Sequence, residues 1–516
     1  MILINSSPKD ALKIFQPFLP IFIPVGVGQL MAELVRAGID ARHLDQQVEE
    51  EVYGRVRELV KDLPKPYIFG FSVLTASYKN ALEVSHNLKR MYPDSIIVFG
   101  GVHPTAVPAE VLGFSHIDLV LRGEGDQLLP QLYRLIKDGK DYSQLPNLSF
   151  RRNGGVQHNP PAPYIHDLDE LAPFPYHLFE QRRDRYDLGF IVSSRGCPHR
   201  CIFCSNRVTT GKRYRFRSNE YIVSEMERLR QDYGVRHILF LDDNLLVDKE
   251  RIYDLMALIR AKGFHRDMTY SFQARGDNVD RPLLRELYAS GFNSVFFGLE
   301  TASEEIMQII KKGETVLECL AAARMAKEIG FHVSATFIFA LPGENHRIRM
   351  DAARLAQELD LDMVRFNNAT PYPGTELYDV ARRQGRLHVE GLYENFNSVS
   401  TFIESPFKKI PFSYLPAGSQ ETEIRNDILI SYLAFYLNPR RLRSILANPD
   451  QGVGWFDASQ LSKLPALFIL GLNLCIKFGD LFWRMLFGRR NQLSFRQLWN
   501  LIRARKRENR RRLAPG

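Results

Sequence analysis

Cysteine is scarce in this chain, and its distribution excludes a disulfide framework. Only five of the 516 residues are cysteine, and three of these lie within eight consecutive positions. A secreted protein that depends on disulfides has its cysteines in pairs along the chain. The N-terminal segment also lacks the charged start and the long apolar stretch of a signal peptide. We therefore expect a cytoplasmic protein in a reducing compartment.

Net charge is nearly absent from the main body of the chain. The whole sequence carries +9. Residues 484–516 contain eleven Arg and Lys and one Glu, a sum of +10, so the preceding 483 residues carry about −1. A basic tail on a neutral body indicates an anionic partner, either phospholipid or nucleic acid.

No apolar run is long enough to cross a bilayer. The strongest run is 464–487, and its most apolar part, 464–476, is shorter than the roughly 20 residues that a spanning helix needs. A narrow polar stripe on such a helix, followed by a basic tail, is typical of a helix in the membrane interface. A helix packed internally or at a dimer interface, with a solvated tail, is the alternative. The stripe, at helical spacing, consists of Asn473, Lys477, Asp480 and Arg484.

Short apolar runs alternate with helical spacing through residues 1–140. This alternation predicts a doubly wound, Rossmann-like α/β domain. The expected strands are 2–5, 67–72, 95–100 and 118–123, and the expected helices are 26–37, 78–91 and 126–137. Because such sheets bind ligands beyond the carboxyl ends of their strands, we expect a site in the turns that follow. Its candidate residues are Ser72, Thr75, Gly100, Gly101, His103, Gly123 and Glu124.

Residues 141–187 are predicted to form a linker, and a second β/α series starts at 188. The linker opens with a hairpin that turns at Asn153-Gly154 and continues as a proline-rich, extended segment. Six β/α units predict a partial TIM-type barrel over 188–385, with its site at the strand carboxyl ends. Residues 386–516 are expected to be helical. The six expected barrel strands are 188–194, 237–243, 269–275, 294–300, 332–340 and 362–368.

The three clustered cysteines, Cys197, Cys201 and Cys204, follow the first of these strands with C-x3-C-x2-C spacing. Thiolates are the usual ligands of iron–sulfur clusters. Three ligands on a four-iron cluster leave one iron open to chelate a substrate or a cofactor. A structural zinc site is the alternative, but it prefers four protein ligands, and no second cysteine pair exists. Cys319 and Cys475 lie in apolar helical stretches, so we expect them in cores.

This cysteine loop, with Phe203 before its third cysteine, resembles the signature of the radical S-adenosylmethionine (SAM) superfamily. The resemblance implies a 4Fe–4S cluster whose open iron binds SAM. It also implies that the reduced cluster cleaves SAM to a 5′-deoxyadenosyl radical. An electron donor such as flavodoxin or ferredoxin would supply the reducing electron.

Residues at later strand ends match places where this family contacts SAM. Asp242, Asp243 and Asn244 follow the second barrel strand and are similar to the cobalamin-binding branch. The resemblance implies that a carboxylate or amide here accepts hydrogen bonds from the ammonium of SAM, with Asp243 preferred. The alternative for Asp243 and Asn244 is a helix N-cap.

The third and fourth barrel strands also end in polar residues. Gln273 and Arg275 end the third, where an arginine can hold a carboxylate. Glu300 ends the fourth, and the resemblance implies that it binds the ribose hydroxyls. A solvated surface carboxylate is the alternative. The segments 339–344 and 371–375 after the next two strands also resemble the family.

The N-terminal domain resembles the cobalamin-binding domain that is fused to such barrels. The turns at 100–105 and 122–125 carry this likeness. The motif Asp-x-His-x-x-Gly, whose histidine binds cobalt in methionine-synthase-type domains, is absent. His103 is a candidate ligand, but we expect it to form hydrogen bonds within its loop. The implied cofactors are therefore the cluster, SAM and cobalamin.

These features favour an enzyme that methylates an unactivated carbon of a hydrophobic, lipid-like substrate. Radical cyclisation or a C–C rearrangement without methyl transfer, as in anaerobic tetrapyrrole cyclases, is the alternative. The thiomethyl-transferring tRNA enzymes of the superfamily carry a second cluster on N-terminal cysteines, and no cysteine precedes Cys197, so we expect no nucleic acid partner. A non-enzymatic sensor would not need the strand-end residues. The C-terminus predicts peripheral attachment to the inner face of the membrane.

Overall fold

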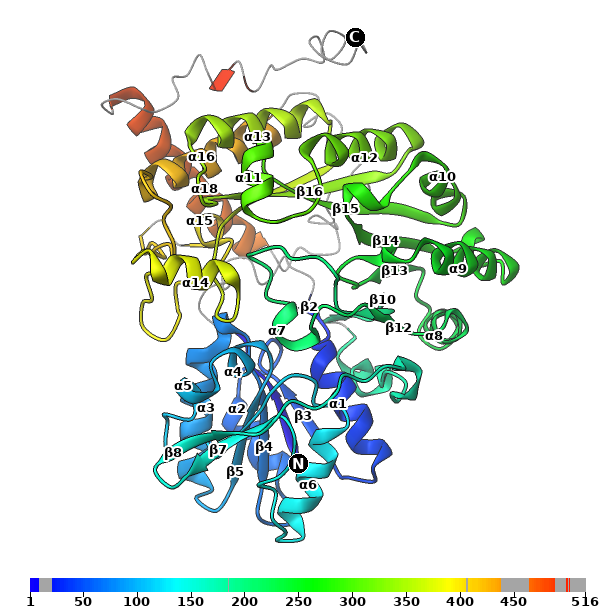
Figure 1. Ribbon diagram of the computed structural model, residues 1–516, viewed down its shortest axis with the longest axis vertical. Helices are drawn as coiled ribbons and strands as arrows, with labels where there is room; N and C mark the ends of the chain where they lie inside the picture. Colours follow the sequence, from blue (N-terminus) through cyan, green and yellow to red (C-terminus); the bar gives the residue numbers. More distant parts are fainter. Residues whose placement is uncertain are drawn as a thin grey trace.

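The computed structural model describes residues 1–8, 21–183, 185–404, 407–437, 464–487, 498–499 and 501. Two large β-sheets organise these residues, and helices cover each of them (Figure 1). The N-terminal sheet, coloured blue to cyan, lies next to the second, green sheet. Most of the basic tail that follows Arg489 in the sequence lies outside the described residues.

The N-terminal sheet has the order β3-β1-β4-β5-β6-β7-β8, and its first five strands are parallel. Helices α2 (Val52–Leu59) and α3 (Tyr78–Met91) pack on one face, and α1 (Val25–Arg36) and α6 (Leu128–Lys137) pack on the other. The predicted doubly wound fold is confirmed. The parallel strands are β3 (Arg42–Asp45), β1 (Ile2–Asn5), β4 (Ile68–Ser72), β5 (Ile96–Gly100) and β6 (Leu119–Leu121).

Alternation along these strands divides the apolar side chains between two cores. In β1, Ile2 and Ile4 join the core under α2 and α3, whereas Leu3 joins the core under α1 and α6. Successive strand residues point to opposite faces, so a strand covered on both sides is apolar throughout. Strand β3 was not predicted, because Leu44 is its only apolar residue and it lies at the sheet edge.

The hairpin expected around Asn153-Gly154 forms from β7 (Leu148–Arg152) and β8 (Gly155–His158). Both turn residues have positive φ, 51° for Asn153 and 79° for Gly154, as a two-residue type I′ turn requires. The hairpin pairs antiparallel with β6 and extends the N-terminal sheet.

The second sheet is parallel, with its six strands in chain order, and remains open like a partial barrel. Its outer face is covered by α8 (Asn219–Asp232), α9 (Lys249–Ala261), α10 (Arg281–Ala289), α12 (Val316–Ile329) and α13 (His346–Glu358). The predicted β/α architecture is confirmed. The strands are β10 (Phe190–Ile191), β13 (His237–Phe240), β14 (Thr269–Ala274), β15 (Phe292–Glu300), β16 (His332–Phe339) and β17 (Met363–Asn368).

The first barrel strand is shorter than predicted. The chain leaves the sheet after Ile191 and forms a second short strand, β11 (Ser194–Arg195), which pairs antiparallel with β12 (Arg215–Phe216). This detour carries the chain out of the barrel wall and into the cysteine loop.

Helix α16 (Glu421–Tyr436) protects the free edge of the open sheet at β17. The backbone N–H of Phe366 donates to the Tyr432 hydroxyl at 3.0 Å. The Tyr436 hydroxyl donates to the Val364 carbonyl oxygen at 3.2 Å. Two tyrosines thus satisfy edge groups that would otherwise attract another strand.

Short strands and α-helices connect these layers. They are β2 (Ile21–Phe22), β9 (Tyr186–Asp187), α4 (Val102–Ala106), α5 (Pro108–Val111), α7 (Arg207–Thr210), α11 (Glu304–Ile309), α14 (Glu376–Arg383) and α15 (Ser400–Ile403).

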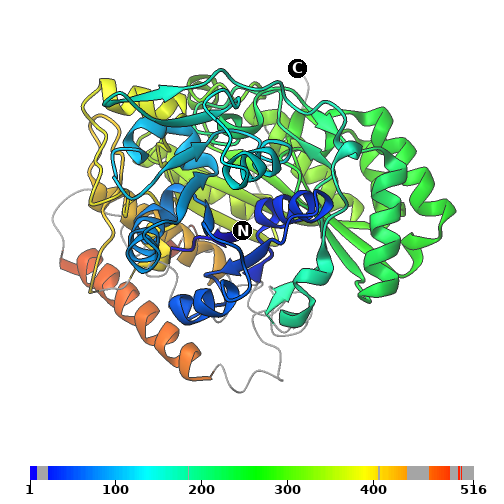
Figure 2. The same cartoon turned by 90° about the horizontal axis from the view of Figure 1, so that it is seen from below.

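The apolar C-terminal run forms one helix, α18 (Leu464–Phe487), at the periphery of the molecule (Figure 2). Leu481 and Phe482 of α18 pack with Leu433 of α16. Cys475, which we expected in a core, is exposed, because it lies on the side of α18 that faces away from α16. Among the described residues, no helix is long and apolar enough to cross a membrane.

Candidate active site

The cysteine loop leaves β11 through Gly196, a position that only glycine can fill without rearrangement. Its φ is +84°, and a Cβ there would lie 2.2 Å from the Arg213 carbonyl oxygen. Backbone bonds hold the middle of the loop: Ile202 N–H donates to the Ile310 oxygen at 3.0 Å, and Leu377 N–H donates to the Ile202 oxygen at 2.9 Å. The loop is therefore fixed to the barrel on both sides of Ile202.

All three loop cysteines are free, half-buried thiols. Burial raises the pKa of Cys197 and Cys201, and it raises the pKa of Cys204 to about 11. Three thiols in a solvent-poor loop suit a metal cluster, because binding it releases their protons and keeps them as thiolates. Phe203 lies between them in the sequence and packs against the barrel core.

A buried set of charges adjoins the cysteine loop. Lys312 donates to Glu300 Oε1 at 2.7 Å and to the Gly298 carbonyl oxygen at 3.0 Å. Its Nζ also lies 3.4 Å from Glu314 Oε1. A Cβ at Gly298 would lie 2.7 Å from Lys312 Nζ, so a side chain there would displace this ion pair. Two carboxylates and one lysine are thus paired closely in a buried place, as buried charged groups require.

Glu300, the candidate for the ribose hydroxyls, is buried, so its alternative as a solvated surface carboxylate is wrong. Its φ of +59° is unusual for a residue with a side chain and coincides with a register shift in β15. Glu300 Oε2 has no hydrogen-bond partner among the described residues. One carboxylate oxygen is thus available to a ligand.

Of the three polar residues after β13, Asp242 and Asn244 are buried and Asp243 is exposed. Asp242 is buried and accepts hydrogen bonds from the Ser193 N–H at 3.2 Å, the Ser193 hydroxyl at 2.8 Å and the Ser194 hydroxyl. It fixes the strand that leads into the cysteine loop. Asp243 is exposed in a recess, and its carboxylate accepts a hydrogen bond from Asn206 just after Cys204. Lost solvation, together with the charge of Asp242, raises the pKa of Asp243 to about 6.

Neither Asp243 nor Asn244 acts as a side-chain helix cap in the described structure. Helix α9 is capped by Asp248, whose carboxylate accepts from the Arg251 N–H at 3.1 Å. Asn244 precedes the short 3-10 turn 245–247 without a side-chain cap bond within the described chain. Both side-chain polar atoms of Asn244 are buried and have no protein partner among the described residues. An unpaired buried amide costs free energy unless a ligand or water pairs it.

The third strand places its two candidates differently. Gln273 is half-exposed and belongs to the face of β14 that points away from the helices, because its neighbours Phe272 and Ala274 join the helix-covered core. Arg275 is buried and donates to Asp277 at 2.8 Å, with Glu314 at 3.9 Å. Its guanidinium is therefore already paired within the protein.

A cavity of about 380 Å³ lies between the two sheets, at the carboxyl ends of strands from both. From the N-terminal domain it is lined by Ser72, Gly100, Gly101, Gly123 and Glu124. From the barrel it is lined by Ser194, Arg195, Gly196, Asn206, Leu241 and Asp243. The candidate residues of both domains thus meet at one cavity, as the strand-end rule for parallel sheets predicts.

Glycine keeps the N-terminal side of this cavity open. Gly101 has a φ of +98°, and a Cβ there would lie 2.8 Å from the Val73 carbonyl oxygen. Thr105 supports the neighbouring turn, because its hydroxyl accepts from the Gly123 N–H at 3.0 Å and donates to the Gly101 oxygen at 2.7 Å. These turns form a close-fitting cradle that a side chain would fill.

Thr75 and His103 do not line this cavity. Both are buried, and His103 Nδ1 lies 3.3 Å from the Thr75 hydroxyl. The His103 ring packs between Tyr78 and Tyr393, and burial lowers its pKa to about 3. His103 was expected to form hydrogen bonds within its own loop, but its side chain instead contacts Thr75 in the turn after β4. The neutral ring stiffens the base of the 100–105 turn.

A clamp of buried ion pairs joins the two domains beside the cavity. Arg195 donates to both carboxylate oxygens of Asp126, at 2.9 Å each, and to Glu124 at 3.2 Å. Arg215 donates to both oxygens of Glu124, at 2.9 and 2.8 Å. Paired guanidinium–carboxylate bonds fix geometry as well as distance. The clamp therefore sets the N-terminal turn 123–126 against the strand that enters the cysteine loop.

The residues present fit the implied cofactors. Three free thiols suit the cluster. The unpaired buried atoms of Asn244 and Glu300 suit a polar ligand, such as SAM, near the strand ends. The glycine cradle suits a large flat ligand that approaches the backbone closely, as cobalamin does.

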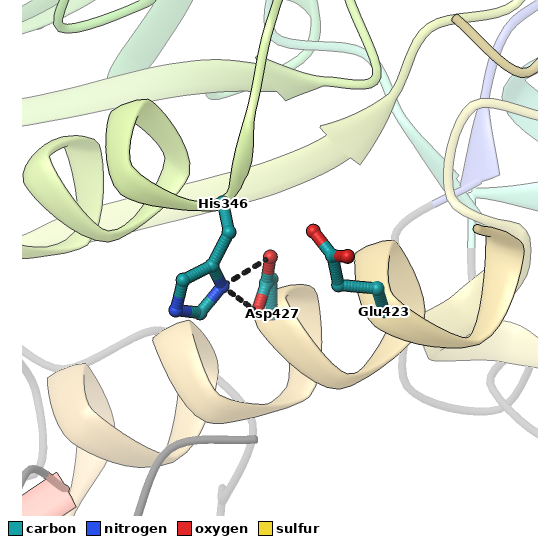
Figure 3. A group of neighbouring side chains, drawn as sticks. All are labelled: His346, Glu423 and Asp427. Atoms are coloured by element: carbon teal, nitrogen blue, oxygen red, sulfur yellow. Dashed lines mark hydrogen bonds and ion pairs between the residues drawn. The ribbon is translucent and has the colours of Figure 1, made fainter. Parts of the chain in front are cut away.

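A second polar group lies on the barrel between α13 and α16 (Figure 3). His346 Nδ1 lies 2.9 Å from Asp427 Oδ1, and Glu423 is nearby. Arg349 binds the same carboxylates, with Nε 2.6 Å from Asp427 Oδ2 and Nη2 on Glu423. Arg349 already pairs with both carboxylates, so this group is a packing network between the helices rather than a metal centre.

The fold and the cavity between the two sheets define a class of protein: a radical SAM barrel joined to a cobalamin-binding domain. The model of the radical SAM superfamily matches residues 191–356, and that of the B12 binding domain matches residues 16–133. The chain is 30% identical over 423 residues to an uncharacterized methyltransferase of Pyrococcus horikoshii, covering 81% of this chain and 89% of that protein. The chain therefore belongs to the radical SAM superfamily, among members with a B12-binding domain. Its cofactors are a 4Fe–4S cluster, SAM and cobalamin.

More distant proteins share this organisation. The anaerobic magnesium-protoporphyrin IX monomethyl ester cyclase of Cereibacter sphaeroides is 24% identical over 87% of this chain and 72% of its own length. The hopanoid C-3 methylase of Methylococcus capsulatus is 27% identical over 70% of this chain and 69% of its own. The solved structure of the cobalamin-dependent SAM radical enzyme OxsB, with aqua-cobalamin and SAM bound, has a TM-score of 0.67 at 15% identity. It covers 97% of this chain and 83% of that one, so it shows the same fold.

Sequence reasoning missed the residues that connect the parts of the site. Arg215 and Asn206 gave no local signal, because their partners lie 91 and 37 residues away in the chain. Lys312 was also missed, although Glu300 and Glu314 are near it in the sequence. Arg195 directly precedes the Gly196-Cys197 step of the motif, and that position was the one available clue.

Proposed function

We propose that this enzyme replaces a hydrogen on an unactivated carbon of a hydrophobic substrate with a methyl group. The observation that carries the proposal is the shared cavity, which glycine turns of the N-terminal domain and strand ends beside the cysteine loop line together. A methyl donor held on one side and a hydrogen-abstracting centre held on the other can then act on the same carbon.

The bound cofactors supply the chemistry: SAM on the cluster provides hydrogen abstraction, and cobalamin provides the methyl group. In the overall reaction, one C–H bond is replaced by a C–CH3 bond. Two SAM molecules are consumed, one leaving as S-adenosylhomocysteine and the other as 5′-deoxyadenosine and methionine. Two electrons come from an external donor such as flavodoxin or ferredoxin.

The protein contributes position and polar recognition. Asp243, held by Asn206, offers a carboxylate to the ammonium of SAM, and Asn244 and Glu300 offer unpaired polar atoms near the same strand ends. We propose that Gln273 contributes a further amide from the inner barrel face. On the opposite side, the turns with Ser72, Gly100, Gly101 and Gly123 hold cobalamin, and Thr75 and His103 brace them from behind.

The substrate side of the proposal rests on the apolar part of the cavity wall. Side chains of the N-terminal domain, the connector and the first barrel strand provide this wall, which suits a nonpolar molecule. The names of two relatives, a hopanoid methylase and a magnesium-protoporphyrin ester cyclase, describe action on hydrophobic ring systems and support the same substrate class. The apolar residues from the connector and the first barrel strand include Leu168, Phe174, Phe190 and Ile191.

Ring formation without methyl transfer is the second candidate, and the cyclase relative favours it. The two reactions differ in their co-products. Methyl transfer yields S-adenosylhomocysteine and 5′-deoxyadenosine together, whereas cyclisation yields no S-adenosylhomocysteine and a product that has lost hydrogens.

The test uses the full chain, reconstituted without oxygen with iron, sulfide and cobalamin, and a strong reductant. SAM with a deuterated methyl group is added to a lipid extract of the source cells. We expect a lipid product that carries an intact trideuteromethyl group and equal amounts of the two nucleoside co-products. Cys201→Ala should abolish 5′-deoxyadenosine, and Cys475→Ala, which changes an exposed cysteine outside the loop, should retain it. A product that only loses hydrogens would overturn methyl transfer.

A further inference from the structure

Helix α18 presents an apolar face to solvent, the reverse of an ordinary surface helix. Five exposed residues follow one another at steps of four, three, four and four, which places them on one stripe. Phe468, Leu472 and Trp483 are 73%, 52% and 64% exposed. The outer stripe, as we call it, consists of Phe468, Leu472, Cys475, Gly479 and Trp483, and contains no charged residue.

The opposite side of α18 is fixed to the protein. Lys477 is only 8% exposed, and its Nζ donates to the Thr401 carbonyl oxygen at 3.0 Å. Leu481 is buried with Leu433 of α16. The helix therefore cannot rotate its outer stripe inward without exposing Leu481 and breaking the bond of Lys477.

This arrangement corrects the expected direction of the polar stripe. Lys477, its central member, faces the protein rather than water. Asp480 is exposed, but it is one residue beyond Gly479 and so lies about 100° around the helix from the outer stripe. The side of α18 that faces outward is thus apolar along its described length.

The charge of the following sequence identifies what covers this stripe. From Arg484 onward the sequence has eleven basic residues and one acidic residue, whereas the rest of the chain is nearly neutral. An anionic bilayer attracts such a segment, and its interface accepts apolar and tryptophan side chains. We propose that the outer stripe of α18 docks into the interface of an anionic lipid bilayer.

The proposal does not depend on the reaction that the enzyme catalyses. Vesicle binding is measured without turnover, and 5′-deoxyadenosine formation is measured without vesicles. A failure of bilayer docking would therefore leave the proposed methyl transfer standing, and the reverse also holds.

The test uses the reconstituted full chain and flotation with two kinds of vesicle, phosphatidylcholine alone or a mixture with phosphatidylglycerol. We expect binding to the anionic vesicles at low salt, and at least about tenfold weaker binding to neutral ones. The variant Phe468→Glu/Leu472→Glu/Trp483→Glu should lose anionic binding by about tenfold or more, with unchanged iron and cobalamin content.

Leu317→Glu is the matched control, since Leu317 is a 66% exposed leucine on α12, away from the stripe. It should bind like the wild type. In addition, brominated lipids should quench tryptophan fluorescence of the wild type more than that of Trp483→Phe.

Three results would overturn the proposal. The first is a wild type that stays unbound to anionic vesicles at low salt. The second is a triple variant that binds as well as the wild type, which would assign binding to the basic tail alone. The third is a wild-type dimer in sedimentation that the triple variant converts to a monomer, because a second copy would then cover the stripe.

Discussion

The clamp between the domains makes a sharp prediction for Asp126→Asn. Asparagine keeps the size of the side chain but removes its charge, and Arg195 loses a bidentate partner that is almost wholly buried. Breaking one side of a buried pair costs about 3–5 kcal/mol, and Glu124 remains on Arg195, so we expect the lower end, about 3 kcal/mol. At about 1.4 kcal/mol per tenfold, separation of the domains becomes roughly 100-fold more frequent.

The pH dependence of this contact has a definite sign. Burial alone raises the pKa of Asp126, but the charge and hydrogen bonds of Arg195 outweigh it, so the pKa falls below the ordinary 3.8. As the pH falls, the unfolded state therefore binds a proton at this carboxyl before the folded state does. The stability contributed by Asp126 is present above roughly pH 4 and is lost as the pH falls through the folded pKa.

Hydrogen exchange at pH 7 measures the effect directly. Peptides that cover 119–128 and 190–217 should exchange about 100-fold faster in Asp126→Asn, and cobalamin affinity should fall in parallel. The control is Glu328→Gln, which removes an exposed ion pair in which Arg281 Nη2 lies 2.6 Å from Glu328 Oε2. It should change the free energy of unfolding by less than about 1 kcal/mol. Protection and cobalamin affinity like those of the wild type in Asp126→Asn would refute the clamp.

Two further predictions concern the cavity and the barrel. Gly101→Ala should weaken hydroxocobalamin binding in a spectroscopic titration by about tenfold or more, because the added Cβ has no room. The control is Gly139→Ala, which also has a positive φ but no described atom within 4 Å of the added Cβ. This control should bind hydroxocobalamin normally. Burial raises the pKa of Glu344 to about 8, so folded-state stability should fall by roughly 4 kcal/mol as pH rises from 4.5 to 8, because the unfolded carboxyl is already ionised. Thermal melts of Glu344→Gln should show a flatter pH profile, and identical slopes would contradict the assignment.

Periodic patterns made most of the fold predictable. Strands such as β14 and β16 alternate buried and half-exposed residues along their length, and this alternation is visible in the sequence. The first barrel strand was predicted too long, because an apolar run does not reveal that the chain leaves the sheet at Val192. The sequence also did not predict that the hairpin β7–β8 joins the N-terminal sheet, since this depends on pairing with β6.

The site was predictable only where its residues are close in the sequence. The cysteine spacing is local, and so are the turns at Gly100 and Gly123. Glu124 was expected to bind a cofactor, and the structure shows both its oxygens engaged by arginines 71 and 91 residues away. Such partners depend on how the domains meet, and no single-sequence pattern records that.

The position of the cysteine loop is therefore a property of the whole chain rather than of its motif. Before the loop, Arg195 is held by the N-terminal domain, and after it, Asn206 is held by Asp243 of the second barrel strand. In its middle, Ile202 is held by backbone bonds to the ends of two helical segments. Three independent attachments fix a short loop at its start, middle and end, and one of them belongs to the domain on the far side of the cavity. A shift of that domain must move Arg195, and with it the start of the loop, so the spacing between the two cofactor sites and the geometry of the loop are set together.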